Sequence, residues 1–182
     1  MITSTERKCS KSTAGVILPD FVKNMTYELT SNNAAGFQAY IDDERIINML
    51  NNGYGDNLLT TASISDLDKY PAIIGNGAGL DTDGFRLYLS EPTKVTSVEF
   101  QLYCPETVGV GLMVQLMGET STLKYPTLID YDNTSNVPEL QTFRYDISSS
   151  TQLLKSMFFH LQAASGSNKS IKMCIPYLKI IT

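Results

Sequence analysis

Rings, amides and basic groups recur at every second position along the second half of the chain, between apolar residues. Aromatic rings stack on the C–H face of a sugar, and amide, imidazole and guanidinium groups exchange hydrogen bonds with its hydroxyls. Because alternate side chains of a strand point to opposite faces, these groups are expected to face away from the core. The predicted sugar-binding residues are Tyr88, Gln101, Tyr103, Gln115, Arg144, His160 and Gln162.

The same outward residues have a second interpretation, which the sequence leaves open. They pack under loops, or they are divided between two sheets and never meet, because consecutive strands of a sandwich often lie in opposite sheets. In that case the loops that carry Tyr54, Tyr125 and Tyr131 are the next candidates, since an exposed ring in a loop can serve as a binding platform.

Two acidic loops are candidate calcium sites. Asp81 and Asp83 alternate before Gly84, and Asp130 and Asp132 alternate before an asparagine. Hard oxygen ligands at alternating positions suit Ca²⁺, although neither loop has the full twelve-residue EF-hand pattern. Aspartate is also common in turns that bind no metal. The sequence therefore leaves two interpretations open for both loops, a structural calcium site or an ordinary turn.

Catalytic patterns are missing around the one histidine of the chain. A histidine base needs a nucleophile or an orienting acid, and no Gly-x-Ser-x-Gly motif accompanies His160. Glycoside hydrolysis needs a pair of carboxylates, and Glu99 is the clearest acid at an outward strand position. The sequence therefore predicts a protein that is not an enzyme.

The elements that must position these residues are strands. Apolar residues alternate with polar ones and turn residues separate the runs, which is typical of half-buried strands in an all-β sandwich. No gap after Gly84 holds an amphipathic crossover helix, so an α/β arrangement is not expected. The predicted strands are Phe85–Leu89, Lys94–Cys104, Val110–Met117, Lys124–Ile129, Gln141–Ile147, Ser156–Ala163 and Ile171–Ile181, the last with a bulge at Pro176.

The first half of the chain has weaker patterns. Acidic residues followed by apolar residues three and four apart predict one short helix from Asp42 to Asn51, ending near Gly53. Short strands are expected at Tyr27–Thr30, Gly36–Ile41 and Leu58–Ile64, and an irregular stretch from Asp66 to Gly84. Residues 1–15 are interpreted as a flexible lead or linker, and residues 16–182 as a single β-sandwich domain.

Charge and hydrophobicity argue against two classes of binding partner, nucleic acids and membranes. The 182 residues carry a net charge of −5 without a basic stripe, which argues against nucleic acid. No apolar run approaches the roughly 20 residues that cross a bilayer, so no membrane partner is expected. The first twelve residues lack the apolar segment of a signal peptide, which indicates either an intracellular protein or a module excised from a longer one.

Six motifs between residues 79 and 182 carry a family resemblance: Gly84–Leu89, Val98–Leu102, Gly111–Gln115, Gln141–Ile147, Ser156–Gln162 and Ile175–Ile180. Together they resemble the galactose-binding-like jelly roll of carbohydrate-binding modules. The resemblance implies a two-sheet antiparallel β-sandwich with at most one or two short helices, often with a structural calcium. It also implies a monomeric, non-catalytic module that binds a polysaccharide and belongs to a larger secreted, extracellular polysaccharide-degrading protein.

One departure from that family is the absence of tryptophan, through which many such modules bind. Tyrosine and phenylalanine must therefore supply any stacking. The main alternative is a structural jelly-roll domain of a viral or phage coat or fibre protein, which would oligomerise through an apolar outer surface such as Met113, Met117 and Phe158. A small β-sandwich enzyme, with paired acids in a cleft, is the third possibility.

Overall fold

The computed structural model describes residues 7–8, 15–30, 37–55, 58–64, 67–75, 83–104, 110–130, 140–163 and 171–182. Within these ranges strands dominate, joined by two α-helices and two 3₁₀ turns. The elements are β1 (Arg7–Lys8), α1 (Asp20–Lys23), β2 (Thr26–Thr30), β3 (Gln38–Tyr40), α2 (Asp43–Tyr54), η1 (Thr61–Ser63), η2 (Leu67–Lys69), β4 (Ala72–Gly75), β5 (Gly84–Thr93), β6 (Ser97–Tyr103), β7 (Val110–Gly118), β8 (Thr122–Asp130), β9 (Leu140–Asp146), β10 (Leu154–Ala163) and β11 (Ile171–Ile181).

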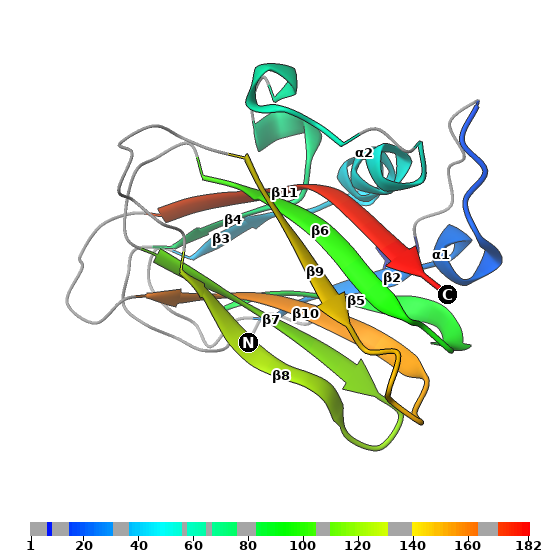
Figure 1. Cartoon of the computed structure of the whole chain (residues 1–182). Helices are drawn as coiled ribbons and strands as arrows, with labels where there is room; N and C mark the ends of the chain where they lie inside the picture. Colours follow the sequence, from blue (N-terminus) through cyan, green and yellow to red (C-terminus); the bar gives the residue numbers. More distant parts are fainter. Residues whose placement is uncertain are drawn as a thin grey trace.

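The strands form two stacked antiparallel sheets (Figure 1). Sheet A has the strand order β1-β2-β5-β10-β7-β8, and sheet B has the order β3-β4-β11-β6-β9. From β5 onward each connection crosses between the sheets, except for the β7–β8 hairpin. The predicted two-sheet antiparallel sandwich is confirmed, as is the prediction of at most two short α-helices. Neither helix in the described ranges has the length and hydrophobicity needed to cross a bilayer.

The core lies between the sheets and is centred on three phenylalanines. Phe85 and Phe159 are register partners on β5 and β10, and their rings stack with centroids 5.4 Å apart. Phe100 of β6 meets Phe159 edge to face across the two layers, at 5.8 Å. All three side chains are fully buried, as the alternation of apolar residues predicts.

Helix α2 begins where the sequence predicts but continues past Gly53. Asp42 is the N-cap, and its Oδ1 accepts a hydrogen bond from the Arg45 amide at 2.8 Å. The apolar face of the helix, which includes Ile46 and Leu50, joins the main core. Tyr54 is the last helical residue and is not part of a loop, so the prediction of an exposed tyrosine platform at this position is wrong.

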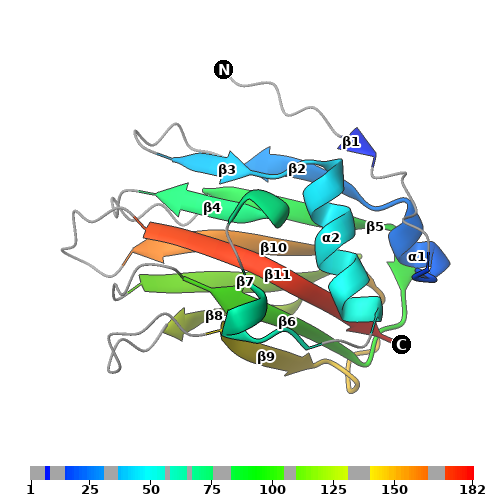
Figure 2. The same ribbon diagram turned by 90° about the horizontal axis from the view of Figure 1, so that it is seen from above.

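Helix α2 lies beside the second half of β11, where β4 no longer pairs with it (Figure 2). Asn52 Nδ2 donates to the Pro176 carbonyl at 2.7 Å. The Tyr54 hydroxyl donates to the Ile180 carbonyl at 3.1 Å and accepts from the Ile180 amide at 3.0 Å. The helix therefore provides hydrogen-bond partners along a strand edge that would otherwise lack them.

Replacing Tyr54 with phenylalanine is expected to lower the free energy of unfolding by about 1–2 kcal/mol at neutral pH, because the Ile180 backbone loses its partner. Burial raises the pKa of Tyr54 to about 12 from the ordinary 10. A raised pKa means that the contribution of Tyr54 to stability is complete below pH 10 and is lost between pH 10 and pH 12. Urea unfolding between pH 10 and pH 12 should show that the parent loses about 2–3 kcal/mol more of its free energy of unfolding than Tyr54→Phe does. The same loss of unfolding free energy with pH in both proteins would contradict this prediction.

Two further differences from the sequence prediction concern the first half of the chain. Ala72–Gly75, within the stretch expected to be irregular, forms β4 and pairs with both β3 and β11. Leu58–Ile64, expected to be a strand, contains the η1 turn, because the Thr60 and Ser63 hydroxyls bond each other at 3.1 Å and the Ser63 amide donates to the Thr60 carbonyl. The predicted bulge at Pro176 is confirmed by a register shift between Cys174 and Tyr177.

Residues 1–15 are predicted to be a flexible lead or linker. Within this stretch, Arg7–Lys8 forms the short strand β1, which pairs with β2.

Candidate functional site

The seven predicted sugar-binding residues do not share one face. Four of them lie on strands of sheet A: Tyr88 on β5, Gln115 on β7, and His160 and Gln162 on β10. The other three, Gln101, Tyr103 and Arg144, lie on β6 and β9 of sheet B. The described side chains of each set face away from the core of their own sheet, so they lie on opposite sides of the sandwich. The side chain of Gln162 lies outside the described residues.

Of the predicted residues on sheet B, Gln101 is buried and Tyr103 is half-buried, whereas Arg144 is exposed. Gln101 is only 2% exposed, and its Nε2 donates to the Leu59 carbonyl at 3.3 Å and to the Thr142 hydroxyl at 3.1 Å. Tyr103 packs against a second apolar cluster that includes Ile64 and Tyr70. The segment after α2 folds over this part of the sheet, so the Gln101 amide bonds protein groups here and does not face the open surface expected from the sequence.

The outer face of sheet A carries its side chains in cross-strand rows. Arg86 of β5, Phe158 of β10 and Gln115 of β7 are direct register partners. The Arg86 guanidinium lies over the Phe158 ring at 4.9 Å, and His160 stacks on the same ring at 4.4 Å. His160 is only 3% exposed, so its predicted role in bonding sugar hydroxyls is not supported. Gln115 is half-buried and donates to the Thr122 hydroxyl at 3.3 Å.

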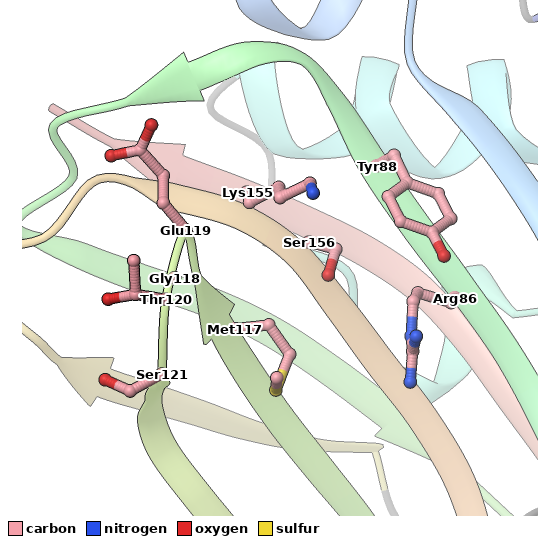
Figure 3. A pocket seen from close by; sticks show the side chains of 9 residues that line it. All are labelled: Arg86, Tyr88, Met117, Gly118, Glu119, Thr120, Ser121, Lys155 and Ser156. Carbon is pink, nitrogen blue, oxygen red and sulfur yellow. The ribbon is translucent and has the colours of Figure 1, made fainter.

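A pocket of about 270 Å³ lies at one end of this face (Figure 3). It is lined by Arg86, Tyr88, Met117, Gly118, Glu119, Thr120, Ser121, Lys155 and Ser156. The volume is slightly below the roughly 300–1,000 Å³ of pockets that hold drug-sized ligands, which suits a ligand the size of one sugar ring. Of the predicted sugar-binding residues whose side chains the structure describes, only Tyr88 lines this pocket.

The Tyr88 ring is held at the pocket wall by a carboxylate on the neighbouring strand. Its hydroxyl donates to Glu28 Oε1 at 2.6 Å, and Arg86 Nη1 lies 3.8 Å from the same oxygen. Burial, with the hydrogen bond to Glu28, raises the pKa of Tyr88. The ring is therefore neutral and fixed in orientation, as a stacking platform requires.

A β-bulge brings Lys155 to the pocket. Leu154 pairs with Gly118 and Ser156 pairs with Met117, so Lys155 is one extra residue between two consecutive pairs. Leu154 points into the core, whereas Lys155 and Ser156 both line the pocket. Such an extra residue re-aims the side chains next to it, and no alternation in the sequence reveals it.

The opposite wall is the β7–β8 turn, which Gln152 holds in place. Gln152 Oε1 accepts from the Thr120 amide at 3.3 Å, the Thr120 hydroxyl at 3.1 Å and the Ser121 amide at 3.2 Å. A Cβ atom on Gly118 would lie 2.6 Å from that oxygen, so glycine is needed for Gln152 to approach the turn. Sequence reasoning missed this wall, although the Gly-Glu-Thr-Ser run marks a turn.

The predicted calcium ligands stay a prediction. Asp81 and Asp132 lie outside the described residues, as does the side chain of Asp130. Asp83 is described and is 5% exposed. Within the described ranges no group of three or more potential metal ligands was found. Tyr131 and the side chain of Tyr125 also lie outside the described residues.

Comparisons with known proteins find similar folds among solved structures only. No protein-family model matches the sequence, and no curated protein matches it. Among solved structures, the fold is similar to a family 11 carbohydrate-binding module from Clostridium thermocellum in complex with a β-1,3-1,4-mixed-linked tetrasaccharide. The identity is 15%, the TM-score is 0.44, and the match covers 100% of this chain and 97% of that one. What this chain binds must therefore be argued from its own side chains.

Proposed function

We propose that this protein is a non-catalytic module that binds a carbohydrate in the pocket on the outer face of sheet A. The observation that carries the proposal is the pocket itself, where one fixed aromatic ring meets several hydrogen-bonding groups. Its place in a larger extracellular polysaccharide-degrading protein, its monomeric state and a structural calcium are further parts of the proposal. They rest on the sequence resemblance.

The pocket has the parts that a sugar needs. The Tyr88 ring supplies a face for stacking, and the Met117 thioether adds an apolar contact on the other side of Ser156. The Ser121 and Ser156 hydroxyls can donate and accept as sugar hydroxyls require, and the Thr120 oxygen, whose hydrogen goes to Gln152, can accept. The pocket lies on paired strands and a braced turn, so little order has to be gained on binding.

Tyr88→Ala is expected to weaken binding several-fold to a hundredfold, because a lost stacking ring typically costs about 1–3 kcal/mol. Tyr88→Phe keeps the ring and loses only the hydrogen bond to Glu28, so its effect should be smaller. The measurement is titration calorimetry with the best ligand from a screen on immobilised polysaccharides, with melting temperatures recorded for each variant.

Tyr40→Ala on sheet B is the matched control and should bind like the parent protein, because Tyr40 is an exposed ring outside the pocket. A Tyr88→Ala variant with unchanged affinity would remove the pocket from consideration. If no glycan binds and the protein elutes as a large oligomer on size-exclusion chromatography, the structural-protein alternative replaces the proposal.

A further inference from the structure

We propose that the ligand of this pocket is an acidic sugar, a uronic acid whose carboxylate is held by Lys155 with the help of Arg86. This inference rests on the proposed function and names the ligand class for the same site. Two of the nine lining residues are cationic and one is anionic, whereas the whole chain has a net charge of −5. Arg86 already pairs with Glu28, so Lys155 is the cation of the lining that remains for a ligand, in a protein that is acidic as a whole.

Lys155 is placed for a ligand more than for the fold. The bulge in β10 turns it to the pocket beside the buried Ser156, and its side chain is exposed. Within the described part of the chain it forms no ion pair, unlike Lys23, Arg45 and Arg86. An ammonium group at a pocket wall without an acidic partner is suited to a negatively charged ligand.

Arg86 is the second cation, and its guanidinium is fixed in position. The group lies over the Phe158 ring at 4.9 Å, and Glu28 Oε1 is 3.8 Å from Nη1, beyond hydrogen-bond distance. The side chain is 30% exposed, so donors remain accessible at the pocket. A planar fork held in this way can bond a carboxylate without a large loss of side-chain freedom.

Glu119 makes the two sides of the pocket different in charge. It comes from the β7–β8 turn, across the pocket from Arg86 in Figure 3. A ligand carboxylate is repelled from Glu119 and attracted toward Lys155 and Arg86, while the carboxylate of Glu119 accepts hydrogen bonds from the sugar hydroxyls. A uronic acid has both groups on one ring, and a neutral sugar leaves the cationic side without a counter-charge.

The test compares an oligogalacturonate with its methyl ester, which keeps the ring and hydroxyls and loses the charge. Titration calorimetry of the parent protein should show about tenfold tighter binding of the free acid, with the difference shrinking as salt is added. Lys155→Gln should reduce this preference to about twofold or less. Lys69→Gln, an exposed lysine outside the pocket, is the charge-matched control and should keep the preference.

The two proposals fail in different ways. If the methyl ester or a neutral glycan binds as well as the acid, the acidic-sugar inference is wrong while carbohydrate binding stands. If the acid is preferred but Lys155→Gln and Arg86→Gln both keep the preference, the carboxylate binds elsewhere and the inference is also wrong. If neither the acid, the ester nor a neutral glycan binds, the proposed function itself falls.

Discussion

Replacing Phe159 with alanine is expected to lower the free energy of unfolding by about 3–5 kcal/mol, because truncating a buried phenylalanine leaves a cavity that the core fills only in part. Phe159 is fully buried, stacks on Phe85 within sheet A and meets Phe100 of sheet B. The Phe159 ring therefore contributes to the packing of sheet A against sheet B. Urea unfolding monitored by circular dichroism measures the loss.

Phe143→Ala is the matched control for this core prediction. Phe143 stacks on Phe100 at 5.6 Å but lies on the edge strand β9 and is only partly buried. Its truncation should cost clearly less than that of Phe159, since part of the space is open to solvent. A loss below about 1 kcal/mol for Phe159→Ala would place that ring outside the core, in conflict with the two-sheet arrangement.

The sequence predicts the strands of the second half well, for a physical reason. One face of each strand is buried, so apolar residues must recur with period two, as Val98, Phe100 and Leu102 do. The β11 strand has the predicted bounds, and its bulge follows from Pro176. The four-residue strand β4 is too short to show such a period, and it was missed.

The candidate site was predicted only in part. Alternation predicts which face of a strand a side chain is on, but it does not predict the sheet to which the strand belongs or the segments that cover that face. Tyr88 and Gln101 have the same pattern around them, yet one lines an open pocket and the other is buried under Leu59. Lys155 was missed because its orientation comes from a bulge, which depends on pairing with β7. The burial of Gln101 and the orientation of Lys155 both depend on residues far away in the sequence, so a local sequence pattern does not predict them.

Gly53→Ala is expected to destabilise the protein by about 3 kcal/mol or more, although alanine is the better helix former by about 0.5–1 kcal/mol. A Cβ atom at this position would lie 2.7 Å from the Leu178 carbonyl carbon and 3.2 Å from the Lys179 amide nitrogen. Both are backbone atoms of β11, which is paired with β6 on its other side and cannot easily retreat. Thermal unfolding of the variant and the parent measures the effect.

The cost of Gly53→Ala should appear first where α2 meets β11. Moving the helix outward breaks the Asn52 bond to Pro176 and both bonds between Tyr54 and Ile180. Hydrogen exchange of the Ile180 amide should therefore accelerate in the variant well before global unfolding, because its acceptor is the Tyr54 hydroxyl. Glu44→Ala, an exposed position on the same helix, should leave this amide protected. An unchanged melting temperature and unchanged Ile180 exchange in Gly53→Ala would show that the helix is not packed this closely on the strand.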